Sequence, residues 1–428
     1  MTTTVSGSGV KASVPARHVI AAVIGNALSF YDFLTYATFS AQIGLTFFPT
    51  HDAKLSLLLS NVVFFLGFLA RPVGGYVIGR MGDRIGRKPA MLWSFTLLGI
   101  GIAALAFTPS YASIGIAAPV LLILFRALQG FALGGEVGPT TAFLVESAPP
   151  EKRGFYTSLQ YLTQDFAVLV AGLVGVVLSW YMSASGLEHY GWRIAFLLGT
   201  AIVPFGLYIR RDLPETLHEP MLDTIGVKPA IPEPPYLKVA ALGLLMLASG
   251  TVVSYVLLYM TSYATVTLGM PVSLAFWATA INGGAGVCFD AVGGWLSDRF
   301  GRKPVMIAGW AVLFVATLPS FYLISSLRSG TALLGATAVL SIIAALASPA
   351  VLISITESLP RKVRSGALAV TYALAISIFG GSAQGIVTQF IRVTGNPMAP
   401  AWYMMGAILI GLAGMTMMKE TAHRRVAV

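Results

Sequence analysis

The chain has 428 residues, of which 56% are hydrophobic and 10% are charged, and its mean hydropathy is +0.79. These values exclude an ordinary soluble multidomain protein, because so few polar residues cannot cover a water-exposed surface of this size. The formal net charge of +10 would indicate a nucleic-acid partner in a soluble protein, so the positions of the basic residues decide what it means.

Apolar segments recur through nearly the whole chain, and each is long enough to cross a bilayer core of about 30 Å as a helix. The first 17 residues carry Lys11 and Arg17 and lead into a segment that contains Asp32, with no small-residue cleavage site, so no signal peptide is indicated. We therefore expect an all-α integral membrane protein with twelve transmembrane helices. The predicted spans are 18–45, 55–79, 89–108, 113–144, 155–182, 192–209, 238–268, 272–296, 304–327, 330–355, 366–391 and 400–418.

The segment 211–237 is the only long polar interruption, and its prolines alternate with acidic residues. This composition is typical of a linker. It predicts an N-terminal six-helix half at 1–210, a cytoplasmic linker at 211–237 and a C-terminal six-helix half at 238–428.

The basic residues are distributed unevenly between the two sides of the predicted spans. If the N-terminus is cytoplasmic, the cytoplasmic segments hold 21 of the 27 Lys and Arg residues. The positive-inside rule therefore predicts that both termini are cytoplasmic, and it explains the net charge as a feature of topology.

An internal repeat supports the division into halves. The sequence GRMGDRIGRKP at 79–89 returns as GWLSDRFGRKP at 294–304, and the pair Glu146 and Arg153 returns as Glu357 and Arg364. The glycines permit close helix approach and the aspartates can accept hydrogen bonds from neighbouring helix ends. Basic residues that only set topology would leave the repeated Gly and Asp unexplained. We expect a cytoplasmic gate formed by Gly79, Asp83, Arg84, Arg87, Glu146, Arg153, Asp298, Arg299, Arg302, Glu357 and Arg364.

The doubled motif resembles the signature of the major facilitator superfamily. Other segments narrow the resemblance to its metabolite:proton symporter family: GNALSFYDF, FLARPVGG, RALQGFALGGEVG, ESAPPEKRGFYTS, RRDLPET and SGALAVTYALAISIFGGSAQ. The last segment, together with TGNPMAPAWYMM at 394–405, is most similar to the citrate and tricarballylate carriers. The resemblance implies the major facilitator fold and a bacterial-type cytoplasmic (inner) membrane. Ser29, Phe30, Val137 and Pro139 depart from the family pattern near the expected cavity.

Ionisable side chains inside the predicted spans are candidates for function, because each costs about 2.5–3.5 kcal/mol to insert at bilayer depth. Helical rise places Asp32 and Arg71 at similar depth, with Arg126 somewhat further from the cytoplasmic surface. By resemblance to proton-coupled facilitators, Asp32 carries the proton and Arg126 is its partner, and a permanent structural ion pair is the alternative. Glu136 is either a secondary proton site or a buried hydrogen-bond acceptor.

The predicted substrate site combines cationic, amide and aromatic side chains. Arg71 is either a carboxylate ligand or a fixed counter-ion to Asp32, and the polar and aromatic members could instead serve helix packing. Asp290, close to the second motif, is interpreted as a structural acid. The predicted substrate-binding residues are Asn26, Tyr36, Arg71, Arg126, Gln129, Gln160, Gln164, Asp165, Tyr372 and Gln384.

No phosphate-binding loop, nucleophile elbow or metal-ligand spacing occurs in the sequence, so neither an enzyme, a cofactor nor a metal site is expected. Import of a trivalent carboxylate into an inside-negative cell costs roughly 7 kcal/mol per 100 mV, which a proton gradient can offset. The resemblance and the two arginines indicate a symporter of citrate or a related tricarboxylate with protons. Uptake of a dicarboxylate, a shikimate-like or a betaine-like metabolite, and drug or metabolite efflux by proton antiport, are the alternatives. The expected partners are a small organic anion, protons and lipid, with no nucleic acid, and we expect a functional monomer.

Overall fold

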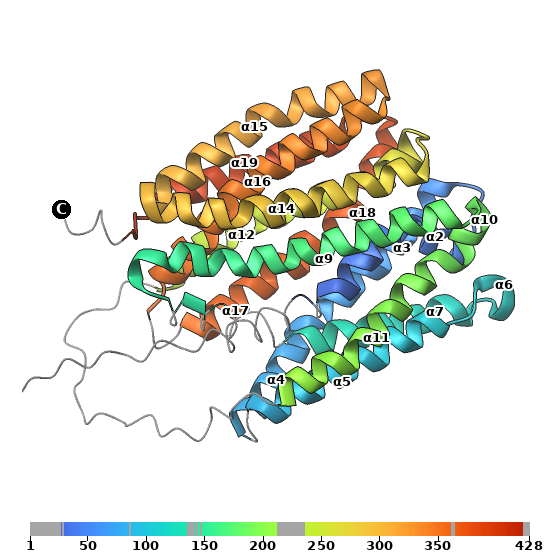
Figure 1. Ribbon diagram of the computed structural model, residues 1–428, viewed down its shortest axis with the longest axis horizontal. Helices are drawn as coiled ribbons and strands as arrows, with labels where there is room; N and C mark the ends of the chain where they lie inside the picture. The colour runs from blue at the N-terminus through green and yellow to red at the C-terminus, as the bar shows by residue number, and fades with distance from the viewer. Residues whose placement is uncertain are drawn as a thin grey trace, which may run out of the picture.

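A computed structural model of the chain describes residues 27, 30–84, 87–134, 141, 144, 145, 148–211, 236–360 and 364–422. Within these ranges every regular element is a helix and no strand occurs. The long helices run side by side along the longest axis of the molecule (Figure 1). This is the arrangement expected where lipid is the solvent, because a helix satisfies its backbone hydrogen bonds within itself.

The first half begins with a helix that covers residues 30–38 and continues through Phe39, whose N–H bonds to the Thr35 carbonyl at 3.0 Å. The elements that follow are α2 (Ser40–Phe47), α3 (Ala53–Leu69), α4 (Arg71–Arg84), α5 (Arg87–Phe107), α6 (Tyr111–Ile114), α7 (Ala117–Leu133), η1 (Pro150–Lys152), α9 (Arg153–Tyr181), α10 (Ala184–Gly186), η2 (Leu187–Gly191) and α11 (Trp192–Arg211).

The second half repeats this plan of long helices joined by short turns. Its elements are α12 (Tyr236–Leu258), α13 (Met260–Ser262), η3 (Tyr263–Thr267), α14 (Val272–Phe300), α15 (Arg302–Leu327), α16 (Gly330–Ser358), α17 (Arg364–Leu374), η4 (Ala375–Gly380), α18 (Gly381–Thr394) and α19 (Ala399–Met417). Most of the predicted linker at 211–237 lies outside the described residues, and the predicted boundaries of the halves stay predictions.

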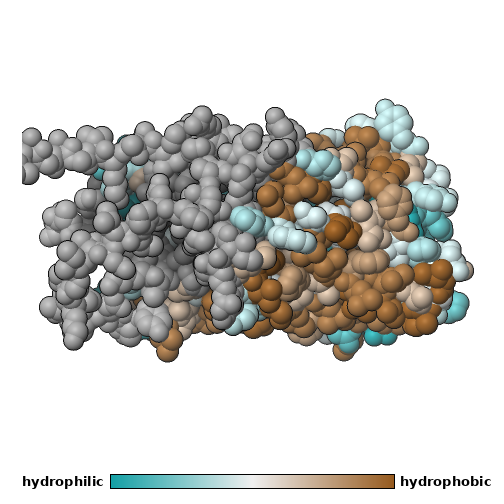
Figure 2. All heavy atoms as spheres, turned by 90° about the horizontal axis from the view of Figure 1, so that it is seen from below, coloured by the Kyte–Doolittle hydropathy of each residue, from teal (hydrophilic) through white to brown (hydrophobic). Residues whose placement is uncertain are grey.

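Eight helices of the described part are long and apolar enough to cross a membrane, and two shorter apolar helices, Leu92–Phe107 and Ala117–Leu133, accompany them. Figure 2 shows apolar side chains over the middle of one face and polar side chains gathered at one end of it. Several predicted boundaries differ from the observed helices by a few residues, and one difference has a clear local cause. The span expected at 113–144 begins at Ala117, because Gly115 adopts φ +58° and turns the chain between α6 and α7.

The two halves meet along α9 and α14, which lie next to each other in the middle of the bundle (Figure 1). Glycines make this close approach possible. A Cβ added to Gly283 would collide with the backbone of Leu169, and one added to Gly294 would lie 2.6 Å from the carbonyl oxygen of Gly154. The contact therefore depends on the absence of side chains at these positions.

Polar contacts join the halves at the end of the bundle that carries Gly154 and Asp298, which we call the motif end. Asp298 of α14 accepts hydrogen bonds from the N–H groups of Gly154 and Phe155 in the first turn of α9, each at 2.9 Å. Arg302 donates to Asp298 at 2.6 Å and to Glu357 at 3.3 Å. The aspartate of the second motif thus caps a helix of the other half, as its residue type predicts.

The opposite end, which we call the far end, is also held together across the halves. The hydroxyl groups of Ser40 and Ser262 lie 3.0 Å apart, and Arg392 pairs with Asp52 at 3.2 Å. The described residues therefore connect the halves at both ends of the bundle.

Candidate functional site

A buried ion pair lies between the first helix and α7. Arg126 donates from Nη1 to Oδ2 of Asp32 at 3.2 Å, and neither side chain has any exposed surface. The same nitrogen donates to Oε1 of Gln129 at 2.7 Å, one turn further along α7. The structure thus brings together three residues that the sequence predicts to act at one site.

A second buried arginine faces the same aromatic ring as the first. The guanidinium carbon of Arg71 lies 4.3 Å from the centre of the Phe33 ring, and that of Arg126 lies 4.2 Å from it. Arg71 also lies 4.1 Å from the Phe68 ring and Arg126 lies 4.4 Å from the Tyr36 ring. Aromatic faces attract such cations, so the rings hold two positive charges close together inside the bundle.

The chain positions Arg71 through a break in its helix. Helix α3 ends at Leu69 and α4 begins at Arg71, because Pro72 has no N–H to continue the hydrogen-bond ladder. The N–H of Gly74 still bonds to the Ala70 carbonyl at 3.0 Å, so α3 and α4 form one bent span. Gly74 and Gly130 pack against the backbone of α7 and α3, which brings Arg71 close to the helix that carries Arg126.

Several buried polar atoms at these residues have no hydrogen-bond partner among the described residues. They are Oδ1 of Asp32, Nε of Arg71, and Nε and Nη2 of Arg126. Buried polar groups in folded proteins are nearly always paired, so free donors on two arginines indicate a place for an acceptor. With one carboxylate against two guanidinium groups, the site is also short of negative charge.

The second half supplies the facing wall. Tyr255 packs on the Phe68 ring that Arg71 also faces, and Tyr372 accepts a hydrogen bond from Gln164 of α9 at 3.2 Å. Gln384 of α18 is 1% exposed, and neither side-chain polar atom has a partner in the described part of the chain. The site therefore lies where the two halves meet.

The other predicted substrate residues take separate positions. Tyr36 donates to the Ser60 carbonyl at 3.1 Å while its ring lies beside Arg126, and Gln160 is buried on α9. Asp165 was expected in the substrate pocket, but its carboxyl group lies against Gly286 of α14 and faces Asp290. Asn26 and Glu136 lie outside the described residues.

The structure describes the predicted gate mainly through its second copy. Asp298, Arg302 and Glu357 form the contacts of the motif end, and Arg153 lies 3.8 Å from Glu357 of the other half. Arg299 lies over the Trp295 ring at 5.4 Å. Gly79 lies in α4, but the structure does not describe Glu146 or the side chains of Asp83, Arg84, Arg87 and Arg364.

Sequence reasoning missed the aromatic side chains that hold the arginines. Phe33, Phe64 and Phe68 are fully or almost fully buried, and Tyr255 packs on Phe64 and Phe68 from the other half. Part of the signal was present, because Phe33 follows Asp32 and Phe68 precedes Arg71 by one helical turn. Tyr255 is far in sequence from both Asp32 and Arg71, so no sequence spacing indicates its part in the site.

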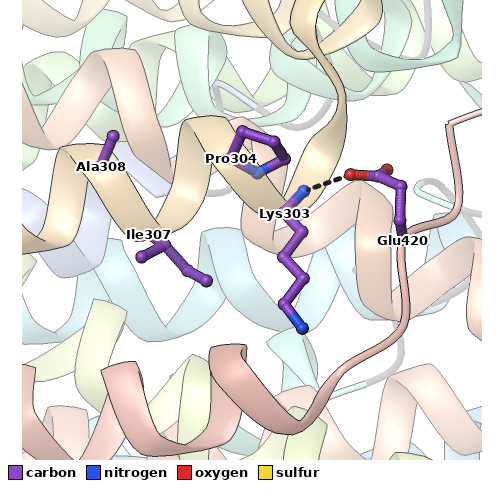
Figure 3. A pocket seen from close by; sticks show the side chains of 5 residues that line it. All are labelled: Lys303, Pro304, Ile307, Ala308 and Glu420. Carbon is purple, nitrogen blue, oxygen red and sulfur yellow. Dashed lines mark hydrogen bonds between the residues drawn. The ribbon is translucent and has the colours of Figure 1, made fainter. Parts of the chain in front are cut away.

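A surface hollow at the motif end is separate from this site. Its lining residues are Lys303, Pro304, Ile307, Ala308 and Glu420, and Figure 3 shows Glu420 pointing at the backbone nitrogen of Lys303. The Glu420 carboxylate accepts hydrogen bonds from the N–H groups of Arg302 and Lys303, each at 3.0 Å, so it caps α15. Burial raises the pKa of Glu420, but the backbone N–H donors outweigh burial and hold its pKa below the ordinary value.

Residues 23–385 match the family described as Major Facilitator Superfamily. The chain belongs to this superfamily. The all-α, twelve-helix membrane fold predicted from the sequence is thereby confirmed. The relatives of this facilitator are named for several different substrates. It is 33% identical over 401 residues to a citrate-proton symporter of Salmonella typhi, covering 92% of each chain.

Two further relatives are named for substrates other than citrate. The facilitator is 32% identical over 388 residues to the alpha-ketoglutarate permease of Escherichia coli strain K12, covering 90% of this chain and 89% of the permease. It is 32% identical over 431 residues to a proline/betaine transporter of Salmonella typhimurium, covering 95% and 84%. The resemblance to metabolite:proton symporters, and to citrate carriers among them, is confirmed at this level of similarity.

Solved structures support the fold. The crystal structure of a D-xylose-proton symporter superposes with a TM-score of 0.77 at 17% identity, covering 95% of this facilitator and 98% of the symporter. At this identity the likeness concerns the fold alone.

Proposed function

We propose that this facilitator is a proton-coupled symporter that imports a small organic carboxylate, with citrate or a related tricarboxylate as the leading candidate. The observation that carries the proposal is the pair of buried arginines, which hold free N–H donors at one ring beside a single aspartate. Carboxylates are the ligands that guanidinium groups bind best. The names of the citrate-proton symporters among its relatives point the same way.

Coupling follows from competition for Arg126. While Asp32 is ionised it accepts a hydrogen bond from Nη1 of Arg126 at 3.2 Å, at the edge of the guanidinium group. A proton on Asp32 weakens this pair and leaves the guanidinium group free to bind a substrate carboxylate. Substrate and proton therefore enter together, and each is released more easily after the other has left.

Protons offset the electrical cost of importing an anion. Each negative charge moved into an inside-negative cell costs about 2.3 kcal/mol per 100 mV, so a trivalent anion needs several protons or their equivalent. We place the motif end at the cytoplasm of a bacterial-type cytoplasmic membrane, because the basic residues concentrate there. The proton gradient is the only energy source that we propose, with no cofactor and no metal.

Alternating access uses the contacts at the two ends of the bundle. Opening toward the outside breaks the far-end contacts at Ser40 and Asp52, and opening toward the cytoplasm breaks the motif-end contacts at Asp298. The site lies between these two sets of contacts, so it can face one side at a time.

Zwitterions such as betaine rank below carboxylates for a structural reason. A quaternary ammonium group needs open aromatic faces, but Phe33, Phe68 and Tyr36 already carry the two guanidinium groups. A drug antiporter would need a large aromatic pocket without paired cationic ligands. Betaine uptake remains an outcome of the test.

The test is uptake by proteoliposomes under an inward proton gradient, with citrate, tricarballylate, ketoglutarate and betaine as substrates. We expect concentrative uptake of a tricarboxylate that a protonophore abolishes. Arg71→Gln should lower this uptake at least about tenfold, because one charged ligand is worth roughly 1.5–3 kcal/mol. The matched control is Arg328→Gln, an exposed arginine between α15 and α16. Accumulation of betaine alone would contradict the proposal.

A further inference from the structure

Two carboxyl groups face each other where the halves of the molecule meet, away from the arginines. A Cβ at Gly286 of α14 would collide with the carboxyl group of Asp165, which comes from α9. Asp290 lies one helical turn after Gly286, and its carboxyl group interacts with that of Asp165. Each half of the facilitator therefore contributes one acid to the same place in the α9 and α14 contact.

Asp290 is buried, Asp165 is half-buried, and the pair lacks a counter-charge. Asp290 is 1% exposed, and no described residue donates a hydrogen bond to either of its oxygens. No Arg, Lys or His of the described part forms an ion pair with either acid. The described groups that act electrostatically on the two acids include no cation. Tyr161 of α9 acts on both, and α16 packs the backbone of Ala345 and Leu346 against Gly293, one turn after Asp290.

Two ionised carboxylates in contact at a buried place are strongly unfavourable, whereas one ionised and one protonated carboxyl group can share a hydrogen bond. We propose that Asp165 and Asp290 form a second proton-binding site, at which the two acids share one proton while α9 and α14 are in contact. This deepens the function proposed above, because its part in transport rests on proton coupling.

The position of the pair links proton binding to movement of the halves. When α9 and α14 separate at this level, water reaches both acids and the carboxylates move apart, so the shared proton is released. Gln164, the neighbour of Asp165, donates a hydrogen bond to Tyr372 of α17, in the second half. The pair and the arginine site thus share residues of one interface, and the proton leaves as the interface opens around the substrate.

The first test is infrared difference spectroscopy on the purified facilitator at neutral pH, in H₂O and in D₂O. We expect the wild type to show a protonated-carboxyl C=O band that shifts on deuteration and that the double variant Asp165→Asn/Asp290→Asn lacks. The matched control Asp32→Asn should retain the band. Equal bands in the wild type and the double variant would overturn the site, as would carboxylate bands that respond to sodium, which would indicate a cation site instead.

A second measurement does not depend on assigning bands. The folded wild type keeps the shared proton, so its thermal stability should fall as the pH rises above neutral, and the double variant should lack this slope. Asn has the shape of Asp and can donate a hydrogen bond across the contact, so the double variant should fold. A wild-type stability that does not change between neutral and alkaline pH would contradict the proposal.

The two proposals fail separately. In proteoliposomes the double variant should carry one proton fewer per substrate than the wild type. If no variant shows proton-coupled uptake, the function proposed above fails, while the infrared result still decides the carboxyl site. If the wild type is proton-coupled and the double variant keeps the same proton count, only the second site fails.

Discussion

Asp32 is the residue whose two charge states matter most for the proposed coupling. Asp32→Asn keeps the size of the side chain but fixes it in a neutral form. We expect this variant to equilibrate labelled substrate across the membrane without accumulating it, because no proton moves on this side chain. In the same proteoliposomes, counterflow measures the equilibration of substrate and gradient-driven uptake measures its accumulation. Glu151→Gln, an exposed acid in η1, is the control, and gradient-driven accumulation by Asp32→Asn would refute the role.

Arg126 also determines stability, because its removal leaves Asp32 buried without a partner. Arg126→Gln should lower the free energy of unfolding by about 3–5 kcal/mol, the usual cost of breaking a buried ion pair. The double variant Asp32→Asn/Arg126→Gln should recover most of this loss, since it leaves no unpaired charge. Thermal unfolding of Asp32→Asn, Arg126→Gln and the double variant in detergent gives the coupling free energy between the two side chains. Additive losses would show that the two side chains do not interact.

At the scale of elements, the contact between α9 and α14 depends on particular glycines. Gly283→Ala would push α9 away, since its Cβ would meet the backbone of Leu169, whereas a Cβ at Gly284 would meet only a Leu169 methyl group at 3.8 Å. We expect Gly283→Ala to slow uptake at least about threefold and to lower stability by about 1–3 kcal/mol. Gly284→Ala is the matched control, and equal behaviour of the two variants would show that the contact tolerates separation.

The N-terminus of α15 gives a pH-dependent prediction. The pKa of Glu420 lies below its ordinary value in the folded chain, so its stabilising effect is present at neutral pH and is lost as the pH falls through that lowered pKa. Glu420→Gln should therefore destabilise the facilitator by about 1 kcal/mol at neutral pH, the usual value of a cap. The difference from the wild type should vanish in acid, and unfolding temperatures across the pH range measure it. A difference that persists in acid would show that the charge of Glu420 is not the cause.

On the scale of the whole molecule, Asp298 joins the halves at the motif end. Asp298→Asn should weaken the bonds to Gly154 and Phe155 and the pair with Arg302, and so favour opening at this end. Amide exchange in the first turn of α9 should rise about tenfold, since a net charged hydrogen bond is worth roughly 1.5–3 kcal/mol. Asp52→Asn at the far end is the control and should raise exchange near Lys54 instead. Unchanged exchange in α9 would contradict the closing role of Asp298.

The sequence predicts the helices well because lipid requires long apolar segments, and the repeat at 79–89 and 294–304 reveals the duplication. Contacts between the halves are harder to predict from the sequence. Arg153 pairs with Glu357 across the halves, and Asp165 meets Asp290, because rigid helices place residues together that no spacing along the chain connects. Spacing along the chain also gives no sign of the π-helical segments Tyr263–Thr267 and Ala375–Gly380. The pairing of Asp32 with Arg126 was predicted from the resemblance to proton-coupled facilitators, and the structure places the two side chains in contact.

The Phe33 ring has a consequence for which carboxylates the site can distinguish. It brings the guanidinium groups of Arg71 and Arg126 to one ring, at 4.3 and 4.2 Å from its centre. A ligand with two carboxylates can bind both arginines as a chelate, and the second contact then forms at a high effective concentration. A monocarboxylate gains only one contact. On the proposed function, affinity should rise from monocarboxylates to ligands with two or more carboxylates, so selection among metabolites would rest on valency more than on the shape of the carbon skeleton.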